Sequence, residues 1–416
     1  MKFQPITRRN FLFLQGPPGE FFWRLAKRLE LLDCGIFRIN LNGGDHADWP
    51  GAATDYHGTR KRWTLFIDRY LSDHAITDLV LFGDCRPLHV AARRMAQLRQ
   101  VSVHVFEEGY IRPDWLTLEP RGVNGNSSLP RDPAWYLGAA RKLPPLPARP
   151  PITASFKRRA RDAFRYYSRV ALATPLYPFY RSHRRSALLM EGLGWLRKFA
   201  GESRDLARAE QVLARLPETP YFLFPLQLSN DYQIREHSPF EDMAEAVDYV
   251  LYSFARCAPD GVRLLIKEHP LDASFVNWRR HINRRARKAG IADRVLHIAG
   301  GDLAELTDGA RGMVTINSTS ATLALAAGVP TIALGKAIYS IPQLTSQGKL
   351  DEFWSRPPLP DPAVFDAFRR VLYDRCLIYG GLASASATET LVQSAIERLV
   401  GDQVSHWAPR LIPAYG

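Results

Sequence analysis

The sequence predicts an α/β protein with two Rossmann-like domains that face a central cleft and a basic helical segment between them. Three observations predict it. Short apolar runs alternate with amphipathic stretches, this alternation occurs twice, and a proline-rich, strongly basic stretch separates the two occurrences. A chain of 416 residues also exceeds what a single hydrophobic core usually supports, so two domains are expected.

The first half of the chain contains short apolar runs with the length of buried strands. Strands are expected over residues 11–15, 35–41, 76–82 and 101–106, with amphipathic helices over 20–32 and 88–99. Strands that alternate with helices form βαβ units, and such units build a parallel sheet.

The same pattern returns in the second half. Strands are expected over residues 221–226, 262–266, 294–298, 313–316 and 330–334, and the helices between them over 240–257, 274–288, 302–308 and 321–327. We therefore expect one domain over 1–205, a second over 206–385, and a C-terminal helix and tail over 386–416 that returns to the first domain.

The stretch between the halves carries nearly all of the net charge. Residues 141–198 open with a proline-rich connector and contain 14 Lys and Arg against two acids, which accounts for +12 of the formal net charge of +13. Aromatic residues lie among the cations, a mixture that suits an anionic bilayer surface. A solvated basic helix and an RNA-binding face are the alternatives, and no RNP or zinc-finger motif supports the RNA-binding alternative.

The cysteines and the N-terminus indicate a cytoplasmic protein. The four cysteines lie far apart and form no CxxC pair, which argues against a zinc ribbon or a disulfide framework. Arg8 and Arg9 resemble the start of a twin-arginine signal, but the apolar run after them ends within a few residues. We expect a chain that is neither secreted nor membrane-spanning.

Two acids follow a predicted strand of the first domain. Glu107 and Glu108 precede Gly109 at the carboxyl end of the strand over 101–106, where open α/β sheets bind their ligands. Neighbouring acids hold their pKa values apart and can supply one ionised carboxylate as base or nucleophile. The alternative is a polar exit from the strand.

Two further motifs leave strands of the second domain. Lys267, His269 and Pro270 follow the strand over 262–266, where an imidazole can donate to a phosphate or leaving-group oxygen. Residues 315–320, which include Ser318 and Ser320, leave the strand over 313–316 and enter a helix, where hydroxyls and backbone N–H groups can hold a phosphate. A structural histidine and ordinary helix capping are the alternatives.

Taken together, these motifs resemble bacterial CMP-sugar transferases with the GT-B arrangement. A narrower resemblance, to the capsule polysaccharide biosynthesis and export family of KpsS/LipB type, covers residues 11–354. It rests on FLQGPPG (13–19), RINLNGGD (38–45), EEGYIRP (107–113), GVNGNSSLP (122–130) and FPLQ (224–227).

The resemblance implies a transferase that moves Kdo, an acidic sugar, from CMP-Kdo to a phosphatidylglycerol-type lipid at the inner face of the cytoplasmic membrane. Other capsule assembly and export proteins are implied partners. The family is thought to retain the anomeric configuration, which calls for a carboxylate nucleophile. Glu108 takes that role by motif position, with Glu107 as the substitute, and His269 with Lys267 stabilises the leaving phosphate.

The resemblance also implies binding residues in each domain. The donor would contact Lys267, Pro270, Gln227, Asn317, Ser318 and Ser320, and the acceptor or sugar would contact Gln15, Gly16, Asn42, Asp45, Arg112 and Asn124. No Asp-x-Asp motif follows a strand, so neither a metal nor a cofactor besides the donor is expected. A non-catalytic capsule assembly component that binds the glycolipid is the alternative from a different functional class.

Overall fold

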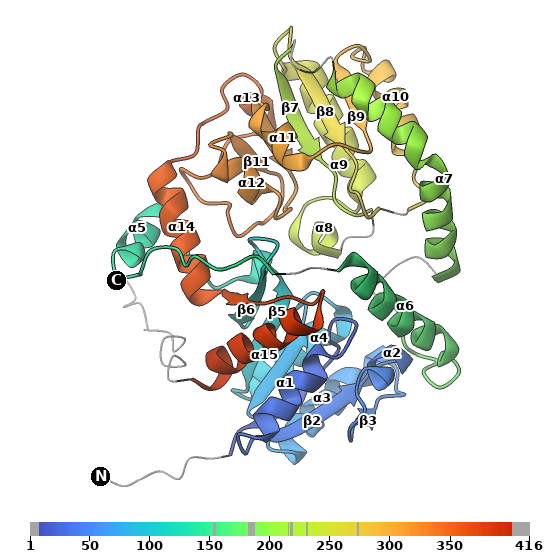
Figure 1. Cartoon of the computed structure of the whole chain (residues 1–416), viewed down its shortest axis with the longest axis vertical. Helices are drawn as coiled ribbons and strands as arrows, with labels where there is room; N and C mark the ends of the chain where they lie inside the picture. The colour runs from blue at the N-terminus through green and yellow to red at the C-terminus, as the bar shows by residue number, and fades with distance from the viewer. Residues whose placement is uncertain are drawn as a thin grey trace. The chain divides into compact units, whose positions relative to one another are not determined.

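The computed structural model of the chain forms two compact α/β units (Figure 1). It describes residues 8–401 except 153–154, 182–187, 215, 217–218, 230–231 and 273. The first unit contains Met1–Ser128, Pro147–His183 and Leu372–Gly416, and the second contains Leu129–Leu146 and Arg184–Val371.

These units differ from the expected ranges 1–205, 206–385 and 386–416 because segments distant in sequence join each core. Helix α7 (Leu188–Leu213) packs on a strand of the second sheet, and β12 (Leu377–Tyr379) pairs with the first sheet. The basic stretch is accordingly divided, with α6 (Phe156–Leu172) in the first unit and α7 in the second.

The first unit contains a seven-stranded sheet in the order β12-β6-β5-β4-β1-β2-β3. Strands β1 to β5 are parallel, whereas β6 and β12 are antiparallel additions at one edge. The expected runs are confirmed as β1, β2, β4 and β5, and the sequence missed the others because they are short or are stabilised only by pairing. The bounds are β1 Asn10–Phe13, β2 Gly35–Asn40, β3 Thr54–Asp55, β4 Asp78–Phe82, β5 Ser102–Glu108 and β6 Trp115–Pro120.

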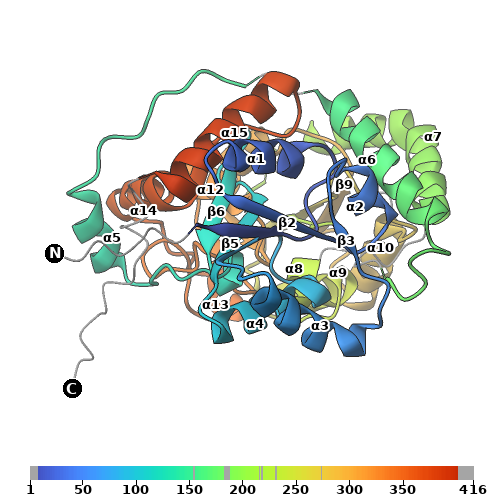
Figure 2. The same ribbon diagram turned by 90° about the horizontal axis from the view of Figure 1, so that it is seen from below.

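Helices cover both faces of this first sheet. In Figure 2, α1 (Phe21–Glu30) and α15 (Ala385–Val400) lie on one face, and α3 (Arg60–Asp73) and α4 (Pro87–Leu98) on the other. Alternate strand residues such as Phe11 and Phe13 pack under α1 and α15, as the period of two in a strand requires. The short α2 (Gly43–Ala47) packs against α6.

The second unit contains a five-stranded parallel sheet in the order β11-β10-β7-β8-β9. Its strands are β7 Tyr221–Pro225, β8 Arg263–Lys267, β9 Val295–Ile298, β10 Gly312–Thr315 and β11 Thr331–Ala333, so all five expected strands are confirmed. Phe222 and Phe224 pack on one side of the sheet, and Leu223 joins a separate cluster on the other.

The helices of the second unit form two layers around its sheet. The layer over Phe222 and Phe224 contains α9 (Met243–Cys257), α10 (Trp278–Lys288) and α13 (Leu350–Phe353), and the opposite layer contains α7, α11 (Leu303–Asp308) and α12 (Ala321–Ala326). Helices α9 and α10 begin later than expected because Asp242 and Asn277 cap their N-termini. The remaining helices are α5 Pro133–Ala140, α8 Tyr232–His237 and α14 Pro362–Arg375.

Each sheet reverses its strand order at one place. In the first unit the reversal falls between β1 and β4, and in the second between β7 and β10. Open α/β sheets bind ligands beside the carboxyl ends of the strands at such a switch point. Within the part of the chain that the structure describes, no helix combines the length and hydropathy needed to cross a bilayer.

Candidate functional site

The two glutamates form the end of β5 instead of following it. The antiparallel ladder with β6 extends the strand, pairing Glu107 with Thr117 and Glu108 with Leu116, so the expected end of the strand at residue 106 was two residues short. Because successive side chains of a strand point to opposite faces, the two carboxylates lie in different surroundings.

Glu107 lies beside the turn that leaves β4. A Cβ atom placed on Gly83 would be 3.4 Å from Oε2 of Glu107 and 3.7 Å from Nε of Arg86, so the bare glycine backbone borders both groups. Burial raises the pKa of Glu107 to about 7, and the charge of Glu108 adds to the rise. A hydrogen bond from the backbone N–H of Glu108 and the charge of Arg86 oppose it.

Glu108 faces cations instead. Its carboxylate accepts a hydrogen bond of 2.7 Å from the guanidinium of Arg159 in α6. Burial acts to raise the pKa of Glu108, but the charges of Arg159 and Arg112 outweigh it, and the pKa lies below its ordinary value. The adjacent acids therefore have separated pKa values, with Glu108 ionised at neutral pH.

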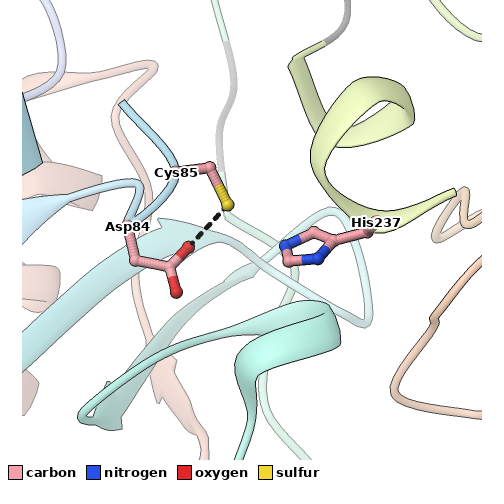
Figure 3. Close-up of side chains that lie close together, drawn as sticks. All are labelled: Asp84, Cys85 and His237. Carbon is pink, nitrogen blue, oxygen red and sulfur yellow. Dashed lines mark hydrogen bonds between the residues drawn. The ribbon is translucent and has the colours of Figure 1, made fainter. Parts of the chain in front are cut away.

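The turn between β4 and α4 contains residues that the sequence reading passed over. The thiol of Cys85 donates to Oδ1 of Asp84 at 3.2 Å (Figure 3). Asp84 is fully buried and also accepts hydrogen bonds from Arg93, from the backbone of Val123 at 3.3 Å and from Asn126 at 2.8 Å. One carboxylate thus joins α4 to residues 122–126. The signal in the sequence was an acid two residues after a predicted strand.

Gln15, Asn42 and Asp45 lie under α6. Nε2 of Gln15 donates to the hydroxyls of Tyr166 at 2.6 Å and Tyr180 at 3.1 Å. Asn42 caps α2 and donates to Tyr166 at 3.1 Å, and Tyr166 donates to Asp45 at 2.9 Å. All three side chains are almost completely buried, so in this structure they hold α6 against the first sheet. Their contact with acceptor or sugar stays a prediction.

A buried ion pair accompanies this network. Arg38 and Asp45 are 3.4 Å apart and both are almost inaccessible to solvent. Burial raises the pKa of Asp45 and the charge of Arg38 opposes the rise, while burial lowers the pKa of Arg38. Removing either partner would leave the other charge buried and uncompensated.

The other first-domain candidates lie in turns. A side chain at Gly16 would bring its Cβ to 2.8 Å from the ring of Phe22, so packing alone requires glycine there. Asn124 has a φ of +53°, and its backbone N–H donates to the hydroxyl of Tyr110 at 2.6 Å. Nε of Arg112 lies 3.5 Å from the carbonyl oxygen of Gly109. No residue among these three is shown to contact a ligand.

In the second unit, Lys267 is the last residue of β8, one residue beyond the expected end of that strand, and His269 follows the strand as expected. Lys267 is buried, and burial together with the nearby charge of Lys198 lowers its pKa. Nδ1 of His269 accepts a hydrogen bond of 3.1 Å from the backbone of Leu271, which places the proton of a neutral imidazole on Nε2. Pro270 is exposed in the same turn.

Asp272 stabilises this turn and was missed by the sequence reading. Its carboxylate accepts hydrogen bonds from Ser229 at 2.6 Å, from the indole of Trp278 at 3.0 Å and from the backbone of Ser274 at 3.1 Å. The loop after β7 and the start of α10 are thereby connected to the His269 turn.

Gln227, Asn317, Ser318 and Ser320 lie at the switch point of the second sheet or directly after it. Nε2 of Gln227 donates to Oδ1 of Asn317 at 2.9 Å, and the backbone N–H of Asn317 donates to Oε1 of Gln227 at 3.1 Å. The hydroxyl of Ser320 donates to that of Ser318 at 2.9 Å. The structure therefore brings these donor-side candidates together beside β7 and β10.

Comparisons with known proteins agree on one family. A sequence model described as capsule polysaccharide biosynthesis protein matches residues 77–381. The chain is 35% identical over 377 residues to the capsule polysaccharide export protein KpsS of Escherichia coli, which covers 88% of this chain and 95% of that protein. It is 36% identical over 373 residues to the capsule polysaccharide modification protein LipB of Neisseria meningitidis serogroup B, covering 87% and 89% of the two chains.

A solved structure also aligns along most of the chain. The β-Kdo 2,7-transferase KpsC of Thermosulfurimonas dismutans covers 94% of this chain and 99% of its own at 15% identity, with a TM-score of 0.45.

Proposed function

Because this chain belongs to the capsule polysaccharide biosynthesis protein family, we propose that it is a glycosyltransferase that moves Kdo from CMP-Kdo to a phosphatidylglycerol-type lipid. The resemblance seen in the sequence motifs is thus confirmed at the level of the family. The observation that carries the proposal of an enzyme is the carboxylate pair at the end of β5, where Glu107 has a pKa of about 7 and Glu108 is ionised.

The contacts of the two acids favour Glu107 as the group that attacks the sugar. Its side chain lies next to Arg86 and the turn that follows β4, at the carboxyl ends of the parallel strands, where ligands bind. The carboxylate of Glu108 is already bound by Arg159. Motif position gave Glu108 as the nucleophile and Glu107 as its substitute, and we propose the opposite assignment. Glu107 is the nucleophile, and Glu108 is the ionised neighbour that helps to set the pKa of Glu107.

A retaining transfer through Glu107 has two steps. The carboxylate forms a bond to the anomeric carbon of Kdo while the bond from that carbon to the phosphate oxygen breaks, and CMP leaves with the electron pair. The acceptor hydroxyl then attacks the same carbon, the bond to the glutamate breaks, and the hydroxyl proton passes to solvent. Two inversions at one carbon retain the configuration.

The second unit supplies the groups proposed to hold the donor. Lys267 and the Nε2–H of His269 would stabilise the charge on the departing CMP phosphate, and Pro270 shapes their turn. Gln227, Asn317, Ser318 and Ser320 would bind the nucleotide beside β7 and β10. Support for these roles comes from their positions at strand ends of a parallel sheet.

Helix α6 and the turn after it are proposed to contact the anionic inner face of the cytoplasmic membrane. Phe164 and Leu172 are about three-quarters exposed, and Arg161, Arg165 and Arg169 are exposed near them on the same helix. Large apolar side chains beside arginines suit the headgroup region of an anionic bilayer. Such contact would keep the enzyme peripheral and close to a lipid acceptor.

A non-catalytic role in capsule assembly or export is the second candidate, and the description of the KpsS relative as an export protein favours it. A protein that only binds glycolipid needs no acid with a pKa near neutrality. RNA binding rests on net charge alone, and it predicts salt-sensitive binding to generic RNA that anionic vesicles do not displace.

The decisive experiment incubates the full chain with CMP-Kdo and a fluorescent lysophosphatidylglycerol and measures the lipid by mass spectrometry. A mass increase of one or more Kdo residues is expected. A lipid of unchanged mass, with the protein still bound to it, would favour the assembly role.

A further inference from the structure

Arg86 is a half-buried cation in the turn between β4 and α4 of the first unit. Its guanidinium makes no hydrogen bond or ion pair with any residue that the structure describes. Other arginines near the acids are engaged, since Arg93 pairs with Asp84 and Arg159 with Glu108. Glu107 and Asp45 interact with this charge from a distance. A partly desolvated guanidinium whose N–H groups donate to no anion costs free energy, and an anion bound directly to it would offset that cost.

The surroundings of Arg86 place it beside the proposed nucleophile. Both Nε of Arg86 and Oε2 of Glu107 lie within 3.7 Å of the position that a Cβ on Gly83 would occupy. The φ of Gly83 is +73°, a conformation that other residues rarely adopt, so glycine is favoured there and the turn presents bare backbone to both groups. This turn lies at the switch point of the first sheet, between the ends of β1 and β4.

The turn is held rigidly by residues that flank Arg86. His89 is fully buried and its Nδ1 lies 2.6 Å from the carbonyl oxygen of Gly83. Burial lowers the pKa of His89 to about 3, so the imidazole is neutral and Nδ1–H is the donor. Asp84 anchors the other side of the turn through Arg93 and Asn126. A guanidinium on such a turn is preorganised to bind a ligand.

We propose that Arg86 binds the carboxylate of the acidic donor sugar and so selects for an acidic sugar over a neutral one. The inference rests on the proposed function. A planar guanidinium matches a carboxylate with two parallel hydrogen bonds, a geometry that lysine does not reproduce. Because the carboxylate of Kdo is attached to its anomeric carbon, this contact also presents that carbon to Glu107.

The test compares ligand binding by the full chain and three variants, using titration calorimetry with CMP-Kdo, with CMP alone and with lysophosphatidylglycerol micelles. Arg86→Gln should weaken CMP-Kdo binding by about 10- to 100-fold and leave CMP binding unchanged, because one charge-assisted pair is lost. The affinity of Arg86→Lys for CMP-Kdo should lie between those of Arg86→Gln and the wild type. Arg94→Gln, at an exposed position on α4, is the matched control and should bind like the wild type.

The outcomes separate this inference from the proposed function. If the wild type binds CMP-Kdo but both Arg86 variants bind it equally well, the inference fails and the proposed function stands. If the Arg86 variants lose binding to the micelles but still bind CMP-Kdo like the wild type, Arg86 binds the lipid phosphate and the inference is likewise overturned. If the wild type binds no CMP-Kdo, both proposals fail. Thermal unfolding of each variant shows whether it is folded. If Arg86→Gln does not fold, the affinity of Arg86→Lys for CMP-Kdo, which is measured with the charge retained, decides the inference.

Discussion

Gln227 and Asn317 hold each other through two reciprocal hydrogen bonds, 2.9 Å and 3.1 Å long, across the switch point of the second sheet. A third bond of 2.9 Å runs from the amide of Asn317 to the carbonyl oxygen of Gln233, at α8. One asparagine therefore ties together the loops after β7 and β10, where the nucleotide is proposed to bind.

Asn317→Ala should lower the free energy of unfolding by about 1–3 kcal/mol, because it leaves the buried amide of Gln227 without this partner. It should also weaken CMP binding, since the two loops are no longer connected. Urea unfolding and titration with CMP measure the two effects. Gln211→Ala, at an exposed position of α7, is the control and should change neither. Wild-type stability in the Asn317 variant would show that the bonds contribute little.

Glu107→Gln should abolish Kdo transfer, with a fall in kcat of at least about a thousandfold, because an amide cannot act as the nucleophile. Glu108→Gln should reduce the rate less, since its carboxylate acts through the neighbouring group. Glu30→Gln, an exposed acid of α1, serves as the control. The assignment is refuted by the opposite ranking, in which Glu108→Gln is inactive and Glu107→Gln is not.

The transfer rate should rise with pH across neutrality. Burial raises the pKa of Glu107 to about 7, so the attacking carboxylate is mostly protonated at pH 6 and mostly ionised at pH 8. The ionised fraction, and with it kcat, should increase by about tenfold over that interval. A rate that falls as the pH rises would mean that the protonated acid is the active form.

Asp84→Asn should destabilise the first unit by about 3–5 kcal/mol. The substitution leaves the half-buried guanidinium of Arg93 without its counter-ion and disturbs the contacts of Asp84 with residues 122–126. Urea unfolding is the measurement. Asp68→Asn, which removes an ion pair with Arg99 at the surface of the same unit, should destabilise the protein far less and provides the comparison.

Replacing Phe164 and Leu172 together by Glu should reduce binding to vesicles that contain phosphatidylglycerol by at least about tenfold, because it removes exposed apolar area and adds negative charge. Vesicle flotation measures the effect. The control replaces Leu31 and Leu98, exposed leucines at the C-terminal ends of α1 and α4 in the same unit, and should bind normally. Equal loss in both double variants would argue against α6 as the membrane contact.

Local sequence patterns were sufficient to predict most strands of the two sheets. Apolar runs of four to seven residues, separated by amphipathic stretches, identified the strands of the second sheet and four of those in the first. The motifs were also sufficient for the family, because they preserve residue types at strand ends. Both kinds of information are contained in short windows of the chain, where the period of side chains decides which face is buried.

Only the tertiary structure decided which side chains are buried, which are paired and which face each one occupies. Pairing with β6 extended β5 and sent Glu107 and Glu108 to opposite faces, and the covering helix α6 buried Gln15, Asn42 and Asp45. The finding that Arg86 has no hydrogen-bonded partner among the described residues required the structure, which shows that Arg93 and Arg159 pair with the acids around it. Pairing, burial and desolvation arise between segments that are distant in sequence, so the environment that sets the chemistry of an acid or an arginine exists only in the folded chain.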